Sequence, residues 1–180
     1  SLADMPYNAE TLDIVSPGTL TTVQSFPGRT GYWHIGVPPS GPFDSCAHRL
    51  GNRVLGNPED AAGLEITLQG PTIRFNQACA FVLTGAELSA TLNGKTVPMW
   101  QVVNAEKGQV LQTGKITGGG MRAYLSIAGG LACPEFLGST STFTLGQFGG
   151  HAGRALQTGD VLKLKAPHVQ AEKTLPAVLR

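Results

Sequence analysis

Short apolar runs separated by turn residues are the feature of this sequence that most limits its fold. Leu20–Gln24, Thr72–Phe75 and Val161–Leu164 are typical runs, and Asn93-Gly94 lies between two others. Such runs suit a pleated surface, and Asn-Gly between them is a strong hairpin signal. Glycine (24 residues) and proline (12 residues) supply turns along the whole chain of 180. Many short strands at close spacing predict a mainly β protein, folded as a β-barrel or a closed sandwich.

One segment has the periodicity of a helix instead, with apolar residues three and four apart between Asp44 and Leu55. Asp44 can cap its first turn, and Gly56 can end it. Asn57-Pro58, followed by acidic residues, predicts a second and shorter helix that ends near Gly63. We therefore expect one or two short helices beside strands at residues 12–15, 20–24, 64–68, 72–75, 80–84, 88–92, 100–103, 109–112, 121–128 and 161–164.

Charge and composition exclude several classes of protein. The net charge is +1 and no basic block is present, so we expect no nucleic-acid partner. The longest apolar run, residues 78–83, is far shorter than the roughly 20 residues of a membrane span, so we expect no membrane association. The four histidines are isolated and the three cysteines have no CxxC spacing. We therefore predict no metal site and no disulfide framework, which fits the cytoplasm.

Residues 26–44 form the most unusual segment, because prolines and glycines alternate there with Tyr32 and Trp33. Proline restricts its own backbone and that of its predecessor, and the two large aromatic rings favour a functional loop over a disordered one. Arg29, between Gly28 and Thr30, could hold a carboxylate or carbonate in a two-pronged pair, or could be an ordinary surface arginine. His34 and Ser40 are further polar candidates in the same segment.

Gln24 and Asp44, at the two ends of this segment, each have both a functional and a structural interpretation. The amide of Gln24 can donate to and accept from a ureido group, although a solvated strand end explains it as well. Asp44 can be a helix cap, and a cap at the rim of a pocket also presents helix amides. Glu65 alternates with apolar residues in its strand, so we expect its side chain to face outward into solvent.

A second unusual stretch, residues 146–154, combines glycines with His151 and Arg154. Backbone amides there could cradle an anion, or the stretch could be a flexible connector. It lacks the GK[ST] ending of a P-loop, so nucleotide binding is not predicted.

Taken together, these segments resemble the carboxyltransferase region of biotin-dependent urea carboxylase, also called allophanate hydrolase subunit 2. The resemblance runs across nearly the whole chain and is most specific between residues 21 and 68. The Phe-Pro-Gly-Arg and Gly-Tyr-Trp forms are more similar to urea carboxylase than to the stand-alone subunits. The resemblance rests on SPG at 16–18, TTVQ at 21–24, FPGRTGYW at 26–33, GVPPSGPFD at 36–44, GNPEDAA at 56–62, LEIT at 64–67 and YLSIAGGL at 124–131.

The resemblance implies a cyclophilin-like β-barrel that transfers a carboxyl group from carboxybiotin to urea, giving allophanate. Biotin would be carried on a carrier domain outside this chain, while ATP and Mg would be used elsewhere in the full enzyme. The partners implied are that carrier domain and the second half of the carboxyltransferase region. Guanidine carboxylases, the C-type component of 5-oxoprolinase and Kip-type regulatory binding proteins share the architecture and remain alternatives.

From residue chemistry we assign Arg29 to steadying the carboxylate, and Gln24 and Ser40 to orienting the ureido group. The remaining candidates for binding substrate or biotin are Tyr32, Trp33, His34, Asp44, His151 and Arg154. We expect residues 1–10 to be a disordered or artificial start, residues 11–168 to form the barrel, and residues 169–180 to be a linker toward a missing second half. On this basis the chain alone would be inactive.

Overall fold

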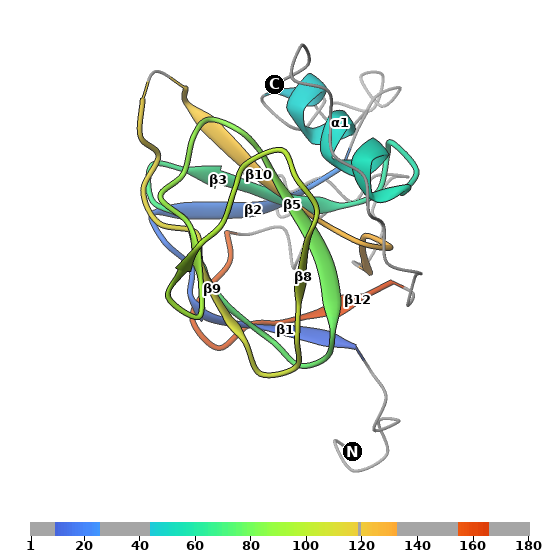
Figure 1. Ribbon diagram of the computed structural model, residues 1–180, viewed down its shortest axis with the longest axis vertical. Coiled ribbons are helices and arrows are strands. Elements are labelled where there is room, and N and C mark those ends of the chain that lie inside the picture. Colours follow the sequence, from blue (N-terminus) through green and yellow to red (C-terminus); the bar gives the residue numbers. More distant parts are fainter. Residues whose placement is uncertain (1–9, 26–43, 119, 133–154, 166–180) are drawn as a thin grey trace, which may run out of the picture.

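The computed structural model describes residues 10–25, 44–118, 120–132 and 155–165. In these ranges the strands form two β-sheets, and helix α1 (Ser45–Leu55) lies beside them (Figure 1). All the pairings between neighbouring strands are antiparallel. Tight turns join some consecutive strands, whereas most of the pairings among the described residues join strands that are not consecutive in the chain.

The first sheet has seven strands in the order β11-β12-β1-β4-β9-β6-β7. Its hairpin β6–β7 turns at Asn93 and Gly94, both with positive φ, as the Asn-Gly signal predicts. The strands are β1 (Thr11–Ser16), β4 (Thr72–Phe75), β6 (Thr91–Leu92), β7 (Lys95–Thr96), β9 (Val110–Gln112), β11 (Leu131–Ala132) and β12 (Val161–Leu164).

The second sheet has five strands in the order β2-β3-β10-β5-β8. Strand β10 lies at its centre, between β3 and β5. The strands are β2 (Leu20–Gln24), β3 (Gly63–Thr67), β5 (Cys79–Gly85), β8 (Val103–Ala105) and β10 (Arg122–Ile127).

The main core lies between the two sheets. Apolar side chains that alternate along the strands meet there, including Ile14, Phe75, Phe81 and Leu125, all essentially inaccessible to solvent. The rings of Phe75 and Phe81 stack across the core with centroids 5.5 Å apart. Burial of this apolar surface is the dominant stabilising contribution to such a fold.

Helix α1 (Ser45–Leu55) covers the outer face of the second sheet, where it packs against β10 and β5 (Figure 1). Its two ends follow the sequence signals: Asp44 caps the first turn, and Gly56 ends the helix with φ 77°. Val54 and Leu55 in its last turn pack on Ala80, Val82 and Ala128 of the sheet side in a second, smaller apolar cluster.

The predicted mainly β fold with a short helix is confirmed. Across the described ranges, hydrogen bonds join the strands into two sheets and do not close them into one barrel. The predicted strand at 88–92 shortens to residues 91–92, and the one at 100–103 moves to 103–105. The second shift has a local cause, because Trp100 adopts φ 63° and so leaves the extended conformation.

The second helix predicted after Asn57 is wrong. The segment makes a single turn closed by the Ala61 amide and the Pro58 carbonyl, 3.0 Å apart. The reason is that the Asn57 side chain does not cap a helix. It donates to the Ile127 carbonyl and accepts from the Gly129 amide, both at 2.7 Å, and so fastens the end of α1 to the sheet.

None of the helical segments in the described ranges has the length and apolar character needed to cross a bilayer.

Candidate functional site

A row of polar side chains crosses the second sheet on the face that α1 covers. Strand pairing places Thr22 opposite Glu65, Glu65 opposite Tyr124, and Tyr124 opposite Thr84. Because side chains alternate between the two faces of a sheet, all four point away from the main core. The N-terminal half of α1 lies over this row, and the Thr84 hydroxyl donates to the Ala47 carbonyl of the helix at 2.9 Å.

Tyr124 links the start of α1 to the sheet. Its hydroxyl accepts from the backbone amide of Asp44 at 2.6 Å and donates to Oε2 of Glu65 at 2.8 Å. Burial, reinforced by the Glu65 charge, raises the pKa of this hydroxyl far above its usual range. Tyr124 therefore stays protonated at physiological pH and serves as a fixed donor to Glu65.

The expectation that Glu65 faces solvent is wrong. Its side chain is 12% exposed, bonded to Tyr124, and its Oε1 lies 3.9 Å from Nε of Arg122. The alternation along β3 placed Glu65 on the correct face. That face is itself buried, however, because α1 and the neighbouring strand side chains cover it.

Gln24 ends β2 on the same face as Thr22, two residues away. Its residue exposure is 6%, so the alternative of a solvated strand end is excluded. The side-chain nitrogen donates to the Thr22 hydroxyl at 3.0 Å, whereas the carbonyl oxygen Oε1 has no hydrogen-bond partner. Whichever way the amide group is turned, one buried polar atom of Gln24 is left unpaired. A buried polar atom without a partner is costly and favours a missing ligand group or water.

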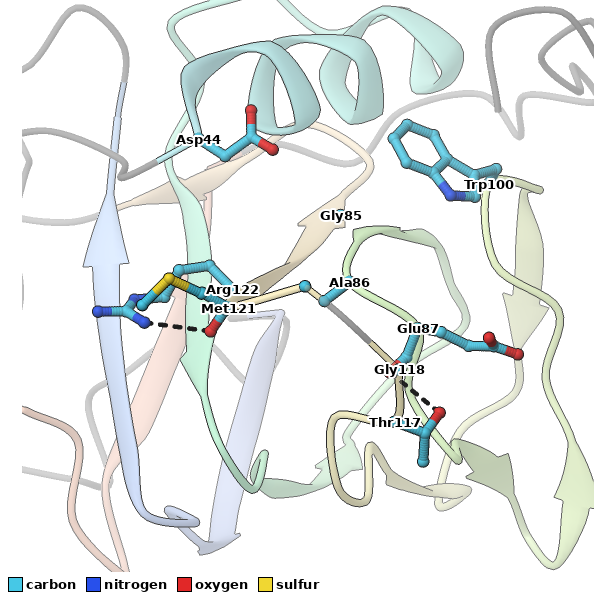
Figure 2. Close-up of a pocket in the computed structure, with 10 residues that line it drawn as sticks. Asp44, Gly85, Ala86, Glu87, Trp100, Thr117, Gly118, Met121 and Arg122 are labelled. Carbon is cyan, nitrogen blue, oxygen red and sulfur yellow. Dashed lines mark hydrogen bonds between the residues drawn. The ribbon is translucent and has the colours of Figure 1, made fainter.

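A pocket of about 470 Å³ opens beside the Asp44 end of the helix. Figure 2 shows Asp44 and Trp100 on the helix side of this pocket, with Glu87 and Thr117 across from them. The guanidinium of Arg122 points away from Trp100, and its Nη1 donates to the Met121 carbonyl at 3.1 Å. The pocket thus presents carboxylates and a large aromatic ring, whereas the Arg122 guanidinium is directed away from that ring.

The helix cap predicted at Asp44 is confirmed, whereas its role in binding substrate or biotin stays a prediction. Its carboxylate accepts from the Ala47 amide at 3.1 Å, as a helix cap does, and the residue also lines the pocket. The structure thus places Asp44 and Gln24 around one polar face. The other predicted site residues, Arg29, Tyr32, Trp33, His34, Ser40, His151 and Arg154, lie outside the described residues.

His48 is on the buried side of α1, with its ring edge-on to Tyr124. Its Nε2 is 3.0 Å from the Ala61 carbonyl, so Nε2 carries the proton, and Nδ1 has no partner. Burial lowers the pKa of His48 from 6.5 to about 4, so the ring is neutral at physiological pH. The described residues hold no group of three His, Cys, Asp or Glu arranged to bind a metal ion.

Sequence reasoning missed Tyr124, Arg122 and Trp100. A signal for the first two is present: Arg122, Tyr124 and Ser126 alternate with apolar residues in one run, which puts them on one face. The position of the helix over that face depends on contacts distant in sequence, and only those contacts reveal that the polar side is buried.

Comparison with known proteins shows which family this chain resembles. Residues 35–179 match the family model described as carboxyltransferase domain, subdomain A and B. Urea amidolyase of Saccharomyces cerevisiae is 47% identical over 158 residues, which are 88% of this chain and 9% of that protein. A 5-oxoprolinase component of Escherichia coli is 39% identical over 153 residues, which are 85% of this chain and 49% of that protein.

The fold recurs in a solved structure as well. The crystal structure of urea carboxylase of Kluyveromyces lactis matches with a TM-score of 0.86 and 45% identity, over 97% of this chain and 16% of that one. This chain therefore spans a small part of the urea amidolyase and urea carboxylase relatives and about half of the oxoprolinase component.

Proposed function

Because the chain belongs to the family of carboxyltransferase domains, subdomains A and B, we propose that it forms part of a biotin-dependent urea carboxylase. The reaction is transfer of a carboxyl group carried by biotin to a urea nitrogen, which gives allophanate. Support comes from the high identity to urea amidolyase along almost the whole chain and from the match to a urea carboxylase structure.

Urea is a poor nucleophile, because its nitrogen lone pairs are delocalised into the carbonyl. A protein can promote its carboxylation by holding both reactants close together and by directing donors at the oxygens where negative charge develops. The pocket beside the Asp44 end of α1 suits the first task, and the Tyr124 hydroxyl holds the Asp44 backbone at its edge. Arg29 and Ser40 are proposed for the second task, on their chemistry alone.

The observation that carries the proposal is the amide group of Gln24, which keeps one buried polar atom unpaired in either orientation. A buried carbonyl oxygen needs an N–H donor, and a ureido group offers N–H donors together with a carbonyl acceptor. Both urea and the ring of biotin contain such a group. The residues present therefore fit a ureido ligand, and Gln24 is assigned to orienting it.

Biotin, when bound, supplies the activated carboxyl group. Tyr32, Trp33, His34, Asp44, His151 and Arg154 are the residues proposed to hold biotin or substrate. The partners proposed are the biotin carrier domain and the rest of the carboxyltransferase region, with ATP and Mg used by another part of the enzyme. The cytoplasm is the proposed compartment, in keeping with the free thiols of Cys46 and Cys79.

The test uses the full-length protein and labelled bicarbonate, with urea, guanidine and 5-oxoproline offered separately as acceptors. We expect ATP-dependent fixation of label into product with urea. Preference for guanidine would identify the guanidine carboxylase alternative, and activity on 5-oxoproline would favour the oxoprolinase component. Absence of fixation with all three acceptors would reject the proposal.

Replacement of Gln24 by Met tests the role of the amide. We expect the KM for urea to rise about 5- to 30-fold, while ATP cleavage without acceptor is unchanged, since a lost hydrogen bond costs roughly 1–2 kcal/mol. Gln77→Met is the matched control. Gln77 also has a buried amide atom without a partner, its side-chain nitrogen. It lies beside β1, however, where its Oε1 accepts from the Thr11 amide. Equal effects of the two substitutions would show that Gln24 matters for folding alone.

A further inference from the structure

Two pocket-lining residues of opposite charge, Asp44 and Arg122, are connected behind the pocket by a chain of polar contacts. The Asp44 amide donates to the Tyr124 hydroxyl, which donates to Oε2 of Glu65. Oε1 of the same carboxylate lies 3.9 Å from Nε of Arg122. The carboxylate of Glu65 thus contacts one pocket residue through Tyr124 and the other directly.

The middle of this chain of contacts is rigid. Tyr124 is fully buried on the central strand β10, and the Glu65 side chain is nearly so on β3 beside it. Cross-strand pairing fixes the two residues directly opposite each other, and the raised pKa of Tyr124 keeps its hydroxyl a donor. Both functions of the hydroxyl, accepting and donating, are used.

We propose that Tyr124 and Glu65 are positioning residues that hold Asp44 and the side chain of Arg122 in fixed places at the edge of the pocket. The inference rests on the proposed carboxyl transfer and adds these two residues to it. Asp44 directly follows residues 26–43 in the chain, so the Tyr124 hydroxyl also fixes the point where that segment joins α1. Misplacement of a reacting group by about 1 Å can cost about 100-fold in rate, which makes such a support important for catalysis.

If Tyr124 only stabilised the fold, its replacement should affect transfer no more than replacement of Thr84, which serves as the comparison. Thr84 lies next to Tyr124 in the same cross-strand row, is equally buried, and also fastens α1 to the sheet through a hydroxyl. That hydroxyl bonds to the Ala47 carbonyl, which is not part of the chain of contacts between the pocket residues. Tyr124→Phe and Thr84→Val each remove one bond between helix and sheet, but only the first breaks the connection between Asp44 and Arg122.

The experiment compares these two variants and Glu65→Gln in the full-length protein. For Tyr124→Phe we expect kcat/KM of carboxyl transfer to fall about 10- to 100-fold, with ATP cleavage in the absence of acceptor unchanged. For Thr84→Val we expect transfer within about twofold of the parent. Glu65→Gln keeps an acceptor for the Tyr124 hydroxyl and removes the charge facing Arg122, so we expect it to fold and to raise the KM of the acceptor.

Hydrogen exchange of the Asp44 amide is measured in parallel, because it reports the Tyr124 contact without any activity. Faster exchange at Asp44 in Tyr124→Phe but not in Thr84→Val supports the positioning role. The positioning role is overturned if Tyr124→Phe and Thr84→Val lose carboxyl transfer equally. It is also overturned if Tyr124→Phe and Glu65→Gln both transfer as well as the parent. Should the parent protein transfer no carboxyl group at all, the proposed function fails, and the exchange measurement still decides whether Tyr124 holds Asp44.

Discussion

The two faces of the sheet β2-β3-β10-β5-β8 are both buried, but by different kinds of side chain. On the inner face, Leu64, Ile66 and Leu125 are fully buried and pack into the main apolar core. On the outer face, the intervening residues Glu65 and Tyr124 are polar and lie under α1. Strand β10 shows the contrast within one element, since its successive residues alternate between the two environments.

This difference between the faces suggests two roles: the apolar inner face stabilises the fold, and the polar outer face provides the candidate site. Burial of apolar surface stabilises without directional requirements, whereas each buried polar group must find a partner or incur a cost. Gln24, His48 and Ser126 on the outer face each retain a side-chain atom without a partner. A face that retains buried polar atoms without partners is expected to serve binding or catalysis, because packing alone would favour apolar residues there.

The largest effect is expected on the inner face, from Leu125→Ala. The substitution removes a fully buried side chain from the main core and leaves a cavity, so we expect the free energy of unfolding to fall by about 2–5 kcal/mol. Chemical denaturation measures this change. Val161→Ala is the control, because Val161 is 51% exposed and should change stability by no more than about 0.5 kcal/mol. Similar losses in both variants would contradict the assignment of the core.

On the outer face, His48 should make stability depend on pH. Its pKa is about 4 in the folded protein and 6.5 when unperturbed, because burial disfavours the charged ring. Between these values the unfolded chain binds a proton that the folded protein does not. The free energy of unfolding therefore falls as the pH is lowered from 6.5 to 4, by an amount on the order of 3 kcal/mol, and this contribution is constant below pH 4.

His48→Gln isolates that contribution from other titrating groups. Glutamine keeps a side-chain donor for the Ala61 carbonyl and does not titrate. Denaturation curves of both proteins between about pH 4 and 7 should diverge, with the parent losing more stability toward acid. Parallel curves would show that the ring is accessible to protons in the folded protein, and that this part of the outer face is less closed than the structure indicates.

Local signals in the sequence were sufficient for most of the fold. The run Leu20–Gln24, the hairpin at Asn93-Gly94 and both ends of α1 formed as predicted, because turn chemistry, alternation and capping act over a few residues. The helix expected after Asn57 did not form, since the asparagine side chain bonds to residues 70 and 72 positions away. A hydrogen-bond partner that distant in sequence cannot be predicted from a local pattern of residues.

The site was predictable only in part for the same reason. Asp44 was recognised because a helix cap has a local signature, and Gln24 because it ends a strand beside an unusual segment. Glu65 was assigned to the correct face, but the burial of that face depends on α1 folding over it. Tyr124 acquires its importance only from bonds to Asp44 and Glu65, 80 and 59 residues away in sequence.

A smaller effect is expected from Thr84→Val, which makes one position of the outer face apolar. The Ala47 carbonyl loses a hydroxyl donor, and valine fills nearly the same volume. We expect a loss of about 1 kcal/mol in the free energy of unfolding, well below the loss for Leu125→Ala. A loss as large as that of the core variant would mean that directional bonds, rather than apolar packing, dominate the stability of this sheet.

The smallest effect, and the one of opposite sign, is expected from Ser126→Ala. The Ser126 hydroxyl is fully buried against α1 and has no partner, so its removal abolishes a desolvation cost. We expect stability to be unchanged or to rise by up to about 1 kcal/mol. Replacement of its neighbour Leu125 by alanine is expected to lower stability instead. The two adjacent positions together are therefore the sharpest test of the difference between the two faces.

Gly51 of α1 provides a test of whether the Ser126 hydroxyl is pressed against the helix. A Cβ atom at Gly51 would lie 2.5 Å from the Ser126 oxygen and 3.3 Å from its Cβ, so Gly51→Ala forces the helix and sheet apart. With Ser126→Ala in the same protein, the closer of these contacts disappears and part of the lost stability should return. If the double variant is as unstable as Gly51→Ala alone, the Ser126 hydroxyl is not pressed against the helix, and its lack of a partner would then carry little cost.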